Sequence, residues 1–498
     1  MEIISWNFFY LSIITIFVYF ILSRRAQNIW LLIVSYFFYS TWNWYFPVVL
    51  LATSLFNFFI AQKIARSEES QKKLYLWIGI SINTIALLSY RIIDNSEVQF
   101  IPSLVSLIRI NTLKDIVLPI GFSFYCLQGI SYLVDVYRMR TSTEDDFVDF
   151  ALYMSYFPKL IAGPIERASS FLPQLKKQRI VDNEKIESGF SLILIGVFRK
   201  VVIAGLLLAN IPNNYLVSSV ENTKPYLGLL SFPFYYYKDP LPYYIRLFGI
   251  ICYVIYLYND FAGYSNIVRG ISTLFGINIS ENFKQPFFAS TFIDFWNRWH
   301  ISLSNWLRDY IYYPLTRRLL RRNNNNPNII NICIPPIITM LVSGLWHGLF
   351  PAMILWGFLY GIILSSEHII FRKWPSLNPQ KQQSFTKLFR IIVVFTITNF
   401  LFVLFASKSL PITFAFWKVL IKGTRQPISG DFPFVFFALP IASFVLDFLQ
   451  SKFEENVFFK TWPTLGKAGV IVIVLMSIAI AAMWTTGSVS EQFVYQGF

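Results

Sequence analysis

Long apolar runs without Asp, Glu, Lys or Arg dominate the pattern along this chain. Residues 5–23, 116–134 and 468–490 are three such runs, and each reaches the roughly 20 residues that cross the hydrocarbon core of a bilayer. Residues 323–366 carry no such charge over a stretch about twice as long, as expected of two spans. The pattern predicts an all-α polytopic integral membrane protein.

With basic loops placed on the cytoplasmic side, the runs predict roughly 11 to 13 membrane segments. Residues 5–23 are too long for the core of a signal peptide and lack its basic start, so we expect them to be a retained first span. Residues 26–62 predict a helical hairpin broken at their proline. Residues 147–174 contain Lys159 and Glu166, so they predict a re-entrant or interfacial element instead of a simple span.

We expect a single transmembrane domain over residues 1–498. It comprises N-terminal helices in 1–115, a core that carries the polar motifs in 116–370, and C-terminal helices in 388–498. No repeat with a period of 20–50 residues is visible by eye, which disfavours a transporter built from inverted repeats.

Composition supports this reading, because 55% of the 498 residues are hydrophobic and 14% are charged, whereas soluble domains need about 25% charged residues. A soluble enzyme, a fibrous protein and a disordered tail are excluded. Lys and Arg number 42 against 27 Asp and Glu. The basic residues sit at the ends of apolar runs, as Arg24-Arg25 do, so the positive-inside rule explains the excess and no nucleic-acid partner is predicted. Cys126, Cys252 and Cys333 are isolated, which predicts neither disulfides nor a thiolate metal site.

The section 281–322 concentrates polar residues between apolar neighbours. If residues 294–310 form one helix, its polar and aromatic side chains fall on adjacent faces. A solvated interfacial helix with an aromatic anchor is the ordinary interpretation. The density of charges favours a functional site, because buried charges are costly unless they are paired. The candidates are Asp294, Arg298, His300, Ser302, Arg308 and Asp309.

His347 is the one side chain in 323–366 that ordinarily titrates near neutral pH. A core histidine bonded to a backbone carbonyl is the alternative to a functional role. The neighbouring Gly344 and Gly348 would leave room for a substrate beside the imidazole. Pro335-Pro336 should break or offset the helix upstream.

Standard hydrolase and nucleotide motifs (G-x-S-x-G, H-E-x-x-H, a P-loop, G-x-G-x-x-G) do not occur. Three histidines without a carboxylate cluster predict no metal site, and we expect no bound cofactor.

Several segments together resemble the membrane-bound O-acyltransferase family, in particular its bacterial alginate O-acetyltransferase branch. The matching motifs are LPIGFSFYCLQGISYLVDVYR (118–138), FPKLIAGPIERASSFLPQ (157–174), YNDFAGYSN (258–266), ENFKQPF with DFWNRWHISLSNWLRDYIY (281–312), GLWHG (344–348) and the closing FVYQGF (493–498).

The resemblance implies a helix bundle around a central tunnel, where a cytoplasmic acyl donor meets an external hydroxyl acceptor. His347 matches the histidine that the family treats as catalytic, and His300 matches its second histidine. The remaining positions implied to line or organise the tunnel are Trp346, Asn259, Asp260 and Tyr264.

The implied function is transfer of an acyl group, expected to be acetyl, to a hydroxyl of a cell-envelope or exported polysaccharide. The donor is an acyl thioester, either coenzyme A or a carrier protein, and the location is the bacterial inner membrane. Asn266 replaces an Asp usual in the alginate branch, and teichoic acid D-alanyl transferases share the DFAGYS and FWNRWH patterns. D-alanyl transfer to teichoic acid, a polysaccharide or lipid transporter, and a scaffold for a separate periplasmic acetyltransferase partner remain alternatives.

For the chemistry, we expect His347 to act as general base in a single displacement. His300 would be its hydrogen-bonding partner, and Asp294 and Asp309 would pair with Arg298 and Arg308.

Overall fold

The computed structural model describes residues 1–94, 119–209, 243–324, 328–377, 384–422, 435–453 and 456–485. Within these ranges the regular structure is helical, and a single isolated antiparallel bridge joins Phe283 to Trp299. Seven described helices are long and apolar enough to cross a membrane, and helix α1 (Trp6–Ile21) is apolar but shorter. The predicted all-α polytopic class is confirmed. The count of 11 to 13 segments and the closing FVYQGF motif involve residues outside the described ranges.

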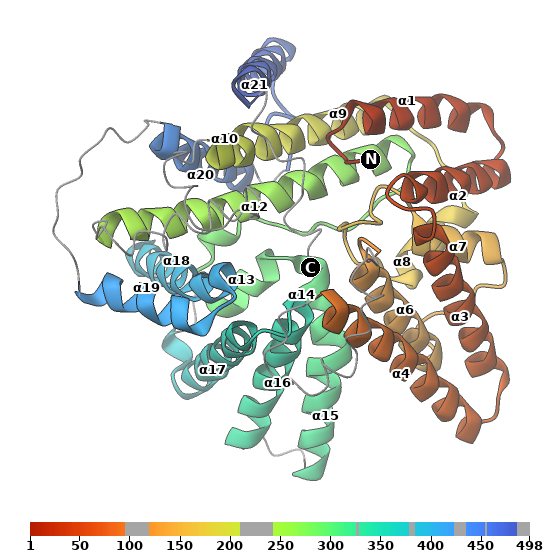
Figure 1. The fold of residues 1–498 in the computed structure, drawn as a ribbon, viewed down its shortest axis with the longest axis horizontal. Helices are drawn as coiled ribbons and strands as arrows, with labels where there is room; N and C mark the ends of the chain where they lie inside the picture. The colour runs from red at the N-terminus through yellow and green to blue at the C-terminus, as the bar shows by residue number, and fades with distance from the viewer. Residues whose placement is uncertain are drawn as a thin grey trace. The chain divides into compact units, whose positions relative to one another are not determined.

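Contacts divide the chain into two compact units. Unit 1 comprises the described residues within 1–193 and 264–281, and unit 2 those within 194–263 and 282–490. Helices α9 (Asn183–Val197) and α12 (Tyr243–Leu274) contribute residues to both units. The other helices of unit 1 are α1, α2 (Arg24–Ser40), α3 (Phe46–Arg66), α4 (Glu69–Asp94), α6 (Phe122–Tyr137), α7 (Phe147–Ser155) and α8 (Ala168–Lys176) (Figure 1).

The first helices of unit 1 follow the apolar pattern closely. Helix α1 begins after Ser5, whose hydroxyl accepts a hydrogen bond from the Phe8 amide at 3.2 Å as an N-cap. The predicted hairpin is confirmed as α2 and α3, with Pro47 in the first turn of α3, where a missing N–H costs nothing.

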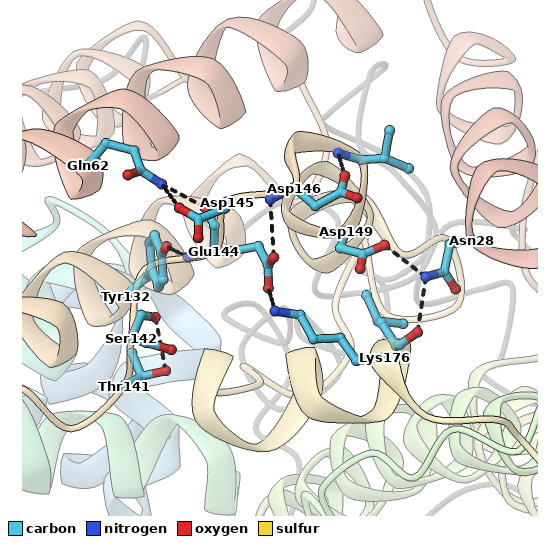
Figure 2. Close-up of polar contacts among 12 residues, drawn as sticks. Asn28, Gln62, Tyr132, Thr141, Ser142, Glu144, Asp145, Asp146, Asp149 and Lys176 are labelled. Atoms are coloured by element: carbon cyan, nitrogen blue, oxygen red, sulfur yellow. Dashed lines mark hydrogen bonds and ion pairs between the residues drawn. The ribbon is translucent and has the colours of Figure 1, made fainter. Parts of the chain in front are cut away.

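The loop before α7 is held by an acidic cluster, shown in Figure 2. The Glu144 carboxylate forms an ion pair with Lys176 at 2.8 Å, and Asp149 accepts a hydrogen bond from the Asn28 amide at 2.8 Å. Asp146 caps α7 by accepting from the Val148 amide at 2.8 Å. These contacts tie α2, α7 and α8 together within unit 1.

Between α7 and α8 the chain is irregular yet buried, as residues 156–166 show. The Lys159 ammonium donates to Gln128 Oε1 and to the Tyr153 carbonyl, each at 2.8 Å. Burial lowers the pKa of Lys159, and the nearby Glu166 carboxylate opposes that shift. The polarity of this section, noted in the sequence, therefore belongs to a buried loop whose charged side chain is bonded to other protein groups.

Unit 2 holds the remaining helices (Figure 1). They are α10 (Leu206–Ala209), α13 (Phe292–Arg298), α14 (Ile301–Leu307), α15 (Tyr313–Arg322), α16 (Ile329–His347), α17 (Pro351–Lys373), α18 (Ser384–Ser407), α19 (Leu410–Lys422), α20 (Val435–Phe453) and α21 (Thr464–Thr485). Short π-helical segments η2 (Phe198–Gly205) and η5 (Arg308–Tyr312) and single-turn segments η4 (Pro286–Phe288) and η6 (Pro375–Leu377) connect them.

Helices α16 and α17 lie side by side with their backbones in close approach (Figure 1). A Cβ on Gly357 would lie 2.3 Å from the Met340 carbonyl oxygen, and one on Gly361 would lie 2.6 Å from the Ile337 Cα. Gly357 and Gly361 are four residues apart on one face, the small-residue spacing that lets membrane helices touch. The pair forms a rigid frame for His347 at the end of α16.

Pro335-Pro336 were predicted to break or offset the helix, and a break is wrong, because α16 continues through both prolines. The Ser365 hydroxyl of α17 lies 2.7 Å from the Gly361 carbonyl of its own helix and 3.1 Å from the Cys333 carbonyl of α16. This contact joins α17 to α16 two residues before the prolines.

Candidate active site

His347 is the last residue of α16. The helix ends because Gly348 is extended and Pro351 opens α17. The imidazole is buried, with its ring centroid 5.6 Å from the Trp356 ring and 5.0 Å from the Phe405 ring. An apolar aromatic wall on α17 and α18 thus surrounds the best candidate for a general base.

The glycines beside His347 do not open a path to the imidazole, contrary to the prediction. A Cβ on Gly344 would lie 2.3 Å from the Met353 carbonyl oxygen, and one on Gly348 would lie 2.8 Å from the Phe350 ring. The space that each glycine leaves is filled by α17 and the turn before it. Their role is therefore close packing of the helix pair.

The single helix predicted over 294–310 is also wrong, because the chain breaks at Trp299 and His300 into α13, α14 and η5. His300 has φ 44° and ψ 54°, a left-handed conformation that costs a residue with a side chain roughly 1–2 kcal/mol. Backbone strain of this kind clusters at functional sites.

Long-range backbone bonds hold His300 in this conformation. The Lys284 amide donates to the Arg298 carbonyl at 3.0 Å, and the Ile301 amide donates to the Asn282 carbonyl at 2.9 Å. The Ser302 amide donates to Asn282 Oδ1 at 3.3 Å. The segment around 282–284 therefore pairs with the chain on both sides of His300 and prevents a continuous helix.

The His300 ring is fully enclosed. Its centroid lies 4.8 Å from the Phe261 ring and 6.0 Å from the Trp346 ring, and Trp346 in turn lies 4.7 Å from the His347 ring. Burial lowers the pKa of His300 to about 3, so the imidazole is neutral at physiological pH. The structure thus brings the two predicted histidines together around Trp346.

The charged candidates pair as predicted, but at sites less buried than expected. Arg298 Nε lies 2.8 Å from Asp294 Oδ1, and their side chains are 28% and 34% exposed. Arg308 Nε lies 3.6 Å from its neighbour Asp309, again with both side chains partly exposed. Neither pair includes a histidine, so the two pairs organise the polar face of α13 and η5.

The residues taken from the YNDFAGYSN motif have framework roles. Asn259 Oδ1 accepts from Arg199 at 2.9 Å, and Asp260 pairs with Lys200. In unit 1, the Tyr264 hydroxyl accepts from the Ala162 amide of the buried loop at 3.2 Å. The motif therefore supplies the ion-pair partner of Lys200, a neutral acceptor for Arg199 and a contact that fixes the buried loop.

The Arg199 guanidinium reaches further partners that the sequence did not indicate. It donates to Asp447 Oδ1 at 2.5 Å and to Gln450 Oε1 at 2.8 Å, and both acceptors are on α20. The Tyr258 hydroxyl donates to the same Asp447 oxygen at 2.9 Å. The Tyr258 ring packs against Trp299, 6.1 Å between centroids. This buried network therefore supports the residue that precedes His300.

A second missed residue is Glu367 on α17. Its carboxylate accepts from the Phe292 amide at 3.0 Å and from the Ile293 amide at 2.8 Å. These amides are the first of α13 and have no partner inside the helix. Next to it, His368 Nε2 lies 3.5 Å from the Tyr312 hydroxyl. Helix α17 thus anchors both ends of the segment that carries His300.

Comparison with known protein families gives a match to one model, described as "MBOAT, membrane-bound O-acyltransferase family", over residues 140–407. The matched region covers more than half of the chain and contains both histidines. The chain belongs to the membrane-bound O-acyltransferase family. It is therefore an acyltransferase, and the transporter interpretation is set aside.

Curated members of the family are similar to this acyltransferase over most of its length. A probable alginate O-acetylase AlgI of Pseudomonas putida is 30% identical, over 91% of this chain and 87% of the relative. A peptidoglycan O-acetyltransferase of Helicobacter pylori is 30% identical, over 79% and 74%. A teichoic acid D-alanyltransferase of Bacillus subtilis is 26% identical, over 58% and 69%.

No group of three or more His, Cys, Asp or Glu that could hold a metal ion occurs among the described residues of this acyltransferase. Cys126 and Cys252 are buried and Cys333 is partly buried, each as a free thiol.

Proposed function

We propose that this acyltransferase moves an acetyl group from a cytoplasmic thioester to a hydroxyl of a cell-envelope or exported polysaccharide, with His347 as general base. The observation that carries the proposal is the placement of His347. It is a buried imidazole at the end of a rigid helix pair, in contact with the same tryptophan as His300. The names of the alginate and peptidoglycan relatives support acetyl as the group and a polysaccharide as the acceptor.

The distribution of charge supports the direction of transfer. Basic residues gather where α15 and α17 end and α18 begins, at the opposite end of α16 from His347. By the positive-inside rule this end faces the cytoplasm of a bacterial inner membrane. Helix α16 has 19 residues, so His347 lies about 27 Å along the helix axis from this cytoplasmic end. It is therefore placed toward an external acceptor. The residues are Arg317, Arg318, Arg321, Arg322, Arg372, Lys373, Lys387 and Arg390.

The chemical step is a direct displacement. His347 removes the proton from the acceptor hydroxyl as its oxygen attacks the thioester carbonyl carbon. The π electron pair moves onto the carbonyl oxygen. The C=O bond then re-forms, the C–S bond breaks with its electron pair on sulfur, and the thiolate takes the proton from His347. The products are the ester and the free thiol.

His300 enters this scheme as a neutral hydrogen-bonding group. A protonated His300 beside His347 would make His347 a weaker base, because like charges disfavour each other. The low pKa of His300 keeps its ring neutral and so avoids this effect. The aromatic wall excludes water, which protects the thioester from hydrolysis. A central tunnel joining donor and acceptor, as the resemblance implies, is part of this proposal.

D-alanyl transfer to teichoic acid is the second candidate. The Bacillus relative supports it, although with lower identity and over a smaller share of this chain. The two reactions differ only in the acyl group and the acceptor, so the roles of His347 and His300 are common to both.

Mass spectrometry of cell-envelope glycans, with and without the gene for this protein, tests the proposal. We expect acetyl esters to disappear from one polysaccharide in the deletion strain. Loss of D-alanyl esters would select the second candidate, and an unchanged glycan profile would contradict both. Acetyl transfer by the purified chain alone would reject the need for a separate acetyltransferase partner.

A further inference from the structure

Among the described residues, the indole N–H groups of Trp356, which contacts His347, and of Trp296, which contacts Trp356, are buried without a hydrogen-bond acceptor. Trp356 on α17 is 1% exposed, and neither its Nε1 nor that of Trp296 on α13 has an acceptor among the described residues. Buried Trp N–H groups usually find a partner, and leaving such a donor unsatisfied is costly. An unsatisfied buried donor in a native site therefore calls for an explanation.

The position of Trp356 suggests what the donor is for. Its ring lies 5.6 Å from the His347 ring at an interplanar angle of 87°. Trp296 packs edge-on against Trp356 at 5.7 Å, one ring further from His347. Tyr360, one turn along α17, lies 5.1 Å from each of the two indoles. The orientation of the Trp356 ring is thus fixed by aromatic contacts on several sides.

We propose that Trp356 is a catalytic residue whose indole N–H binds the carbonyl oxygen of the acyl group and stabilises the oxyanion formed beside His347. This inference rests on the proposed function, since it needs acyl transfer at His347. In the displacement described above, negative charge develops on the carbonyl oxygen as the hydroxyl oxygen attacks. A fixed donor in a water-excluded site stabilises that charge without reorganising during the reaction.

The decisive variant replaces Trp356 with 3-benzothienylalanine, which keeps the shape of tryptophan but has sulfur in place of the N–H. We expect kcat for acetyl transfer to fall by about 10²-fold, the effect of removing one oxyanion donor. The KM for the thioester should change little, because the interaction forms mainly in the transition state. The thermal unfolding midpoint in detergent should not fall, since no bond made in the free protein is lost.

Trp417 provides the matched control. Its Nε1 already donates to the Phe400 carbonyl at 3.3 Å, so it is not free to bind an acyl carbonyl and the same replacement there should leave kcat unchanged. Replacement at Trp296 should reduce kcat less than at Trp356, because its ring lies further from His347. Trp356→Phe gives a second measurement that needs only a coding change. We expect it to reduce kcat, whereas its thermal unfolding midpoint should change little.

Three results would overturn the inference. They are an unchanged kcat in folded protein with 3-benzothienylalanine at Trp356, a loss of kcat that follows a loss of stability, and a larger loss at Trp296 than at Trp356. His347→Ala, measured in parallel, separates this inference from the proposed function. If His347→Ala is inactive while the isosteric Trp356 variant is fully active, only the role of Trp356 fails.

Discussion

The buried pair of Arg199 and Asp447 makes a sharp prediction about stability. Both side chains are about 1–2% exposed, and Asp447 Oδ1 accepts from both Arg199 and Tyr258. Replacing Asp447 with Leu leaves a guanidinium in the protein interior without its carboxylate, beside neutral groups such as Asn259 and Gln450. Removal of one partner from a buried ion pair costs roughly 3–5 kcal/mol. We therefore expect Asp447→Leu to lower the free energy of unfolding by about that amount.

The control is Asp294→Leu, which removes the partner of Arg298 from a pair that is about one-third exposed. Such pairs contribute roughly 0–1 kcal/mol. The double variant Arg199→Met/Asp447→Leu removes both buried charges and should recover much of the loss. Unfolding is followed by tryptophan fluorescence of the detergent-purified protein during titration with denaturing detergent. A cost for Asp447→Leu no larger than for Asp294→Leu, or a double variant less stable than the single one, would refute the reasoning.

Three further predictions concern the frame of the site. Gly361→Leu should abolish the yield of folded protein measured by size-exclusion chromatography, because the leucine side chain would overlap Ile337 of α16. Gly469→Ala should leave the yield unchanged, because a Cβ at Gly469 would meet no atom within 4 Å. Glu367→Ala should lower the free energy of unfolding by about 1–2 kcal/mol through loss of the α13 cap, and Glu367→Gln, which keeps one acceptor, should cost less; equal costs would contradict the cap. The pKa of His300 is about 3 in the folded protein, whereas an ordinary histidine has a pKa of about 6.5. Between these two pH values the unfolded chain binds one proton more than the folded protein, so the free energy of unfolding should fall by up to about 1.4 kcal/mol per pH unit below pH 6.5. Measurements of unfolding against pH should show that the His300→Gln variant lacks this component.

The apolar pattern was enough to predict the helices because burial in lipid requires long uncharged runs. This pattern predicted the hairpin of α2 and α3. It also predicted the two spans α16 and α17, with His347 at their junction. The motif resemblance selected His300 and His347, which the structure brings to one tryptophan.

The sequence could not predict features that depend on distant residues. The break at His300 is caused by backbone pairing with 282–284, and helical periodicity contains no signal for it. Asp447 lies 248 residues from Arg199, so no local pattern in the sequence indicates that these two charges pair. Nothing in the sequence indicated a role for Trp356, because a single tryptophan among many apolar residues is indistinguishable from an ordinary core residue.

Acetyl transfer by purified protein tests the central claim most directly. The chain is reconstituted in lipid nanodiscs with an acetyl thioester and the acceptor identified by glycan analysis, and ester formation is followed by mass spectrometry. We expect His347→Ala, inserted and folded like the wild type, to reduce the rate by roughly 10²–10⁴-fold, the contribution of a general base, and His300→Ala to have a smaller effect. A folded His347→Ala protein that forms ester at the wild-type rate would contradict the account.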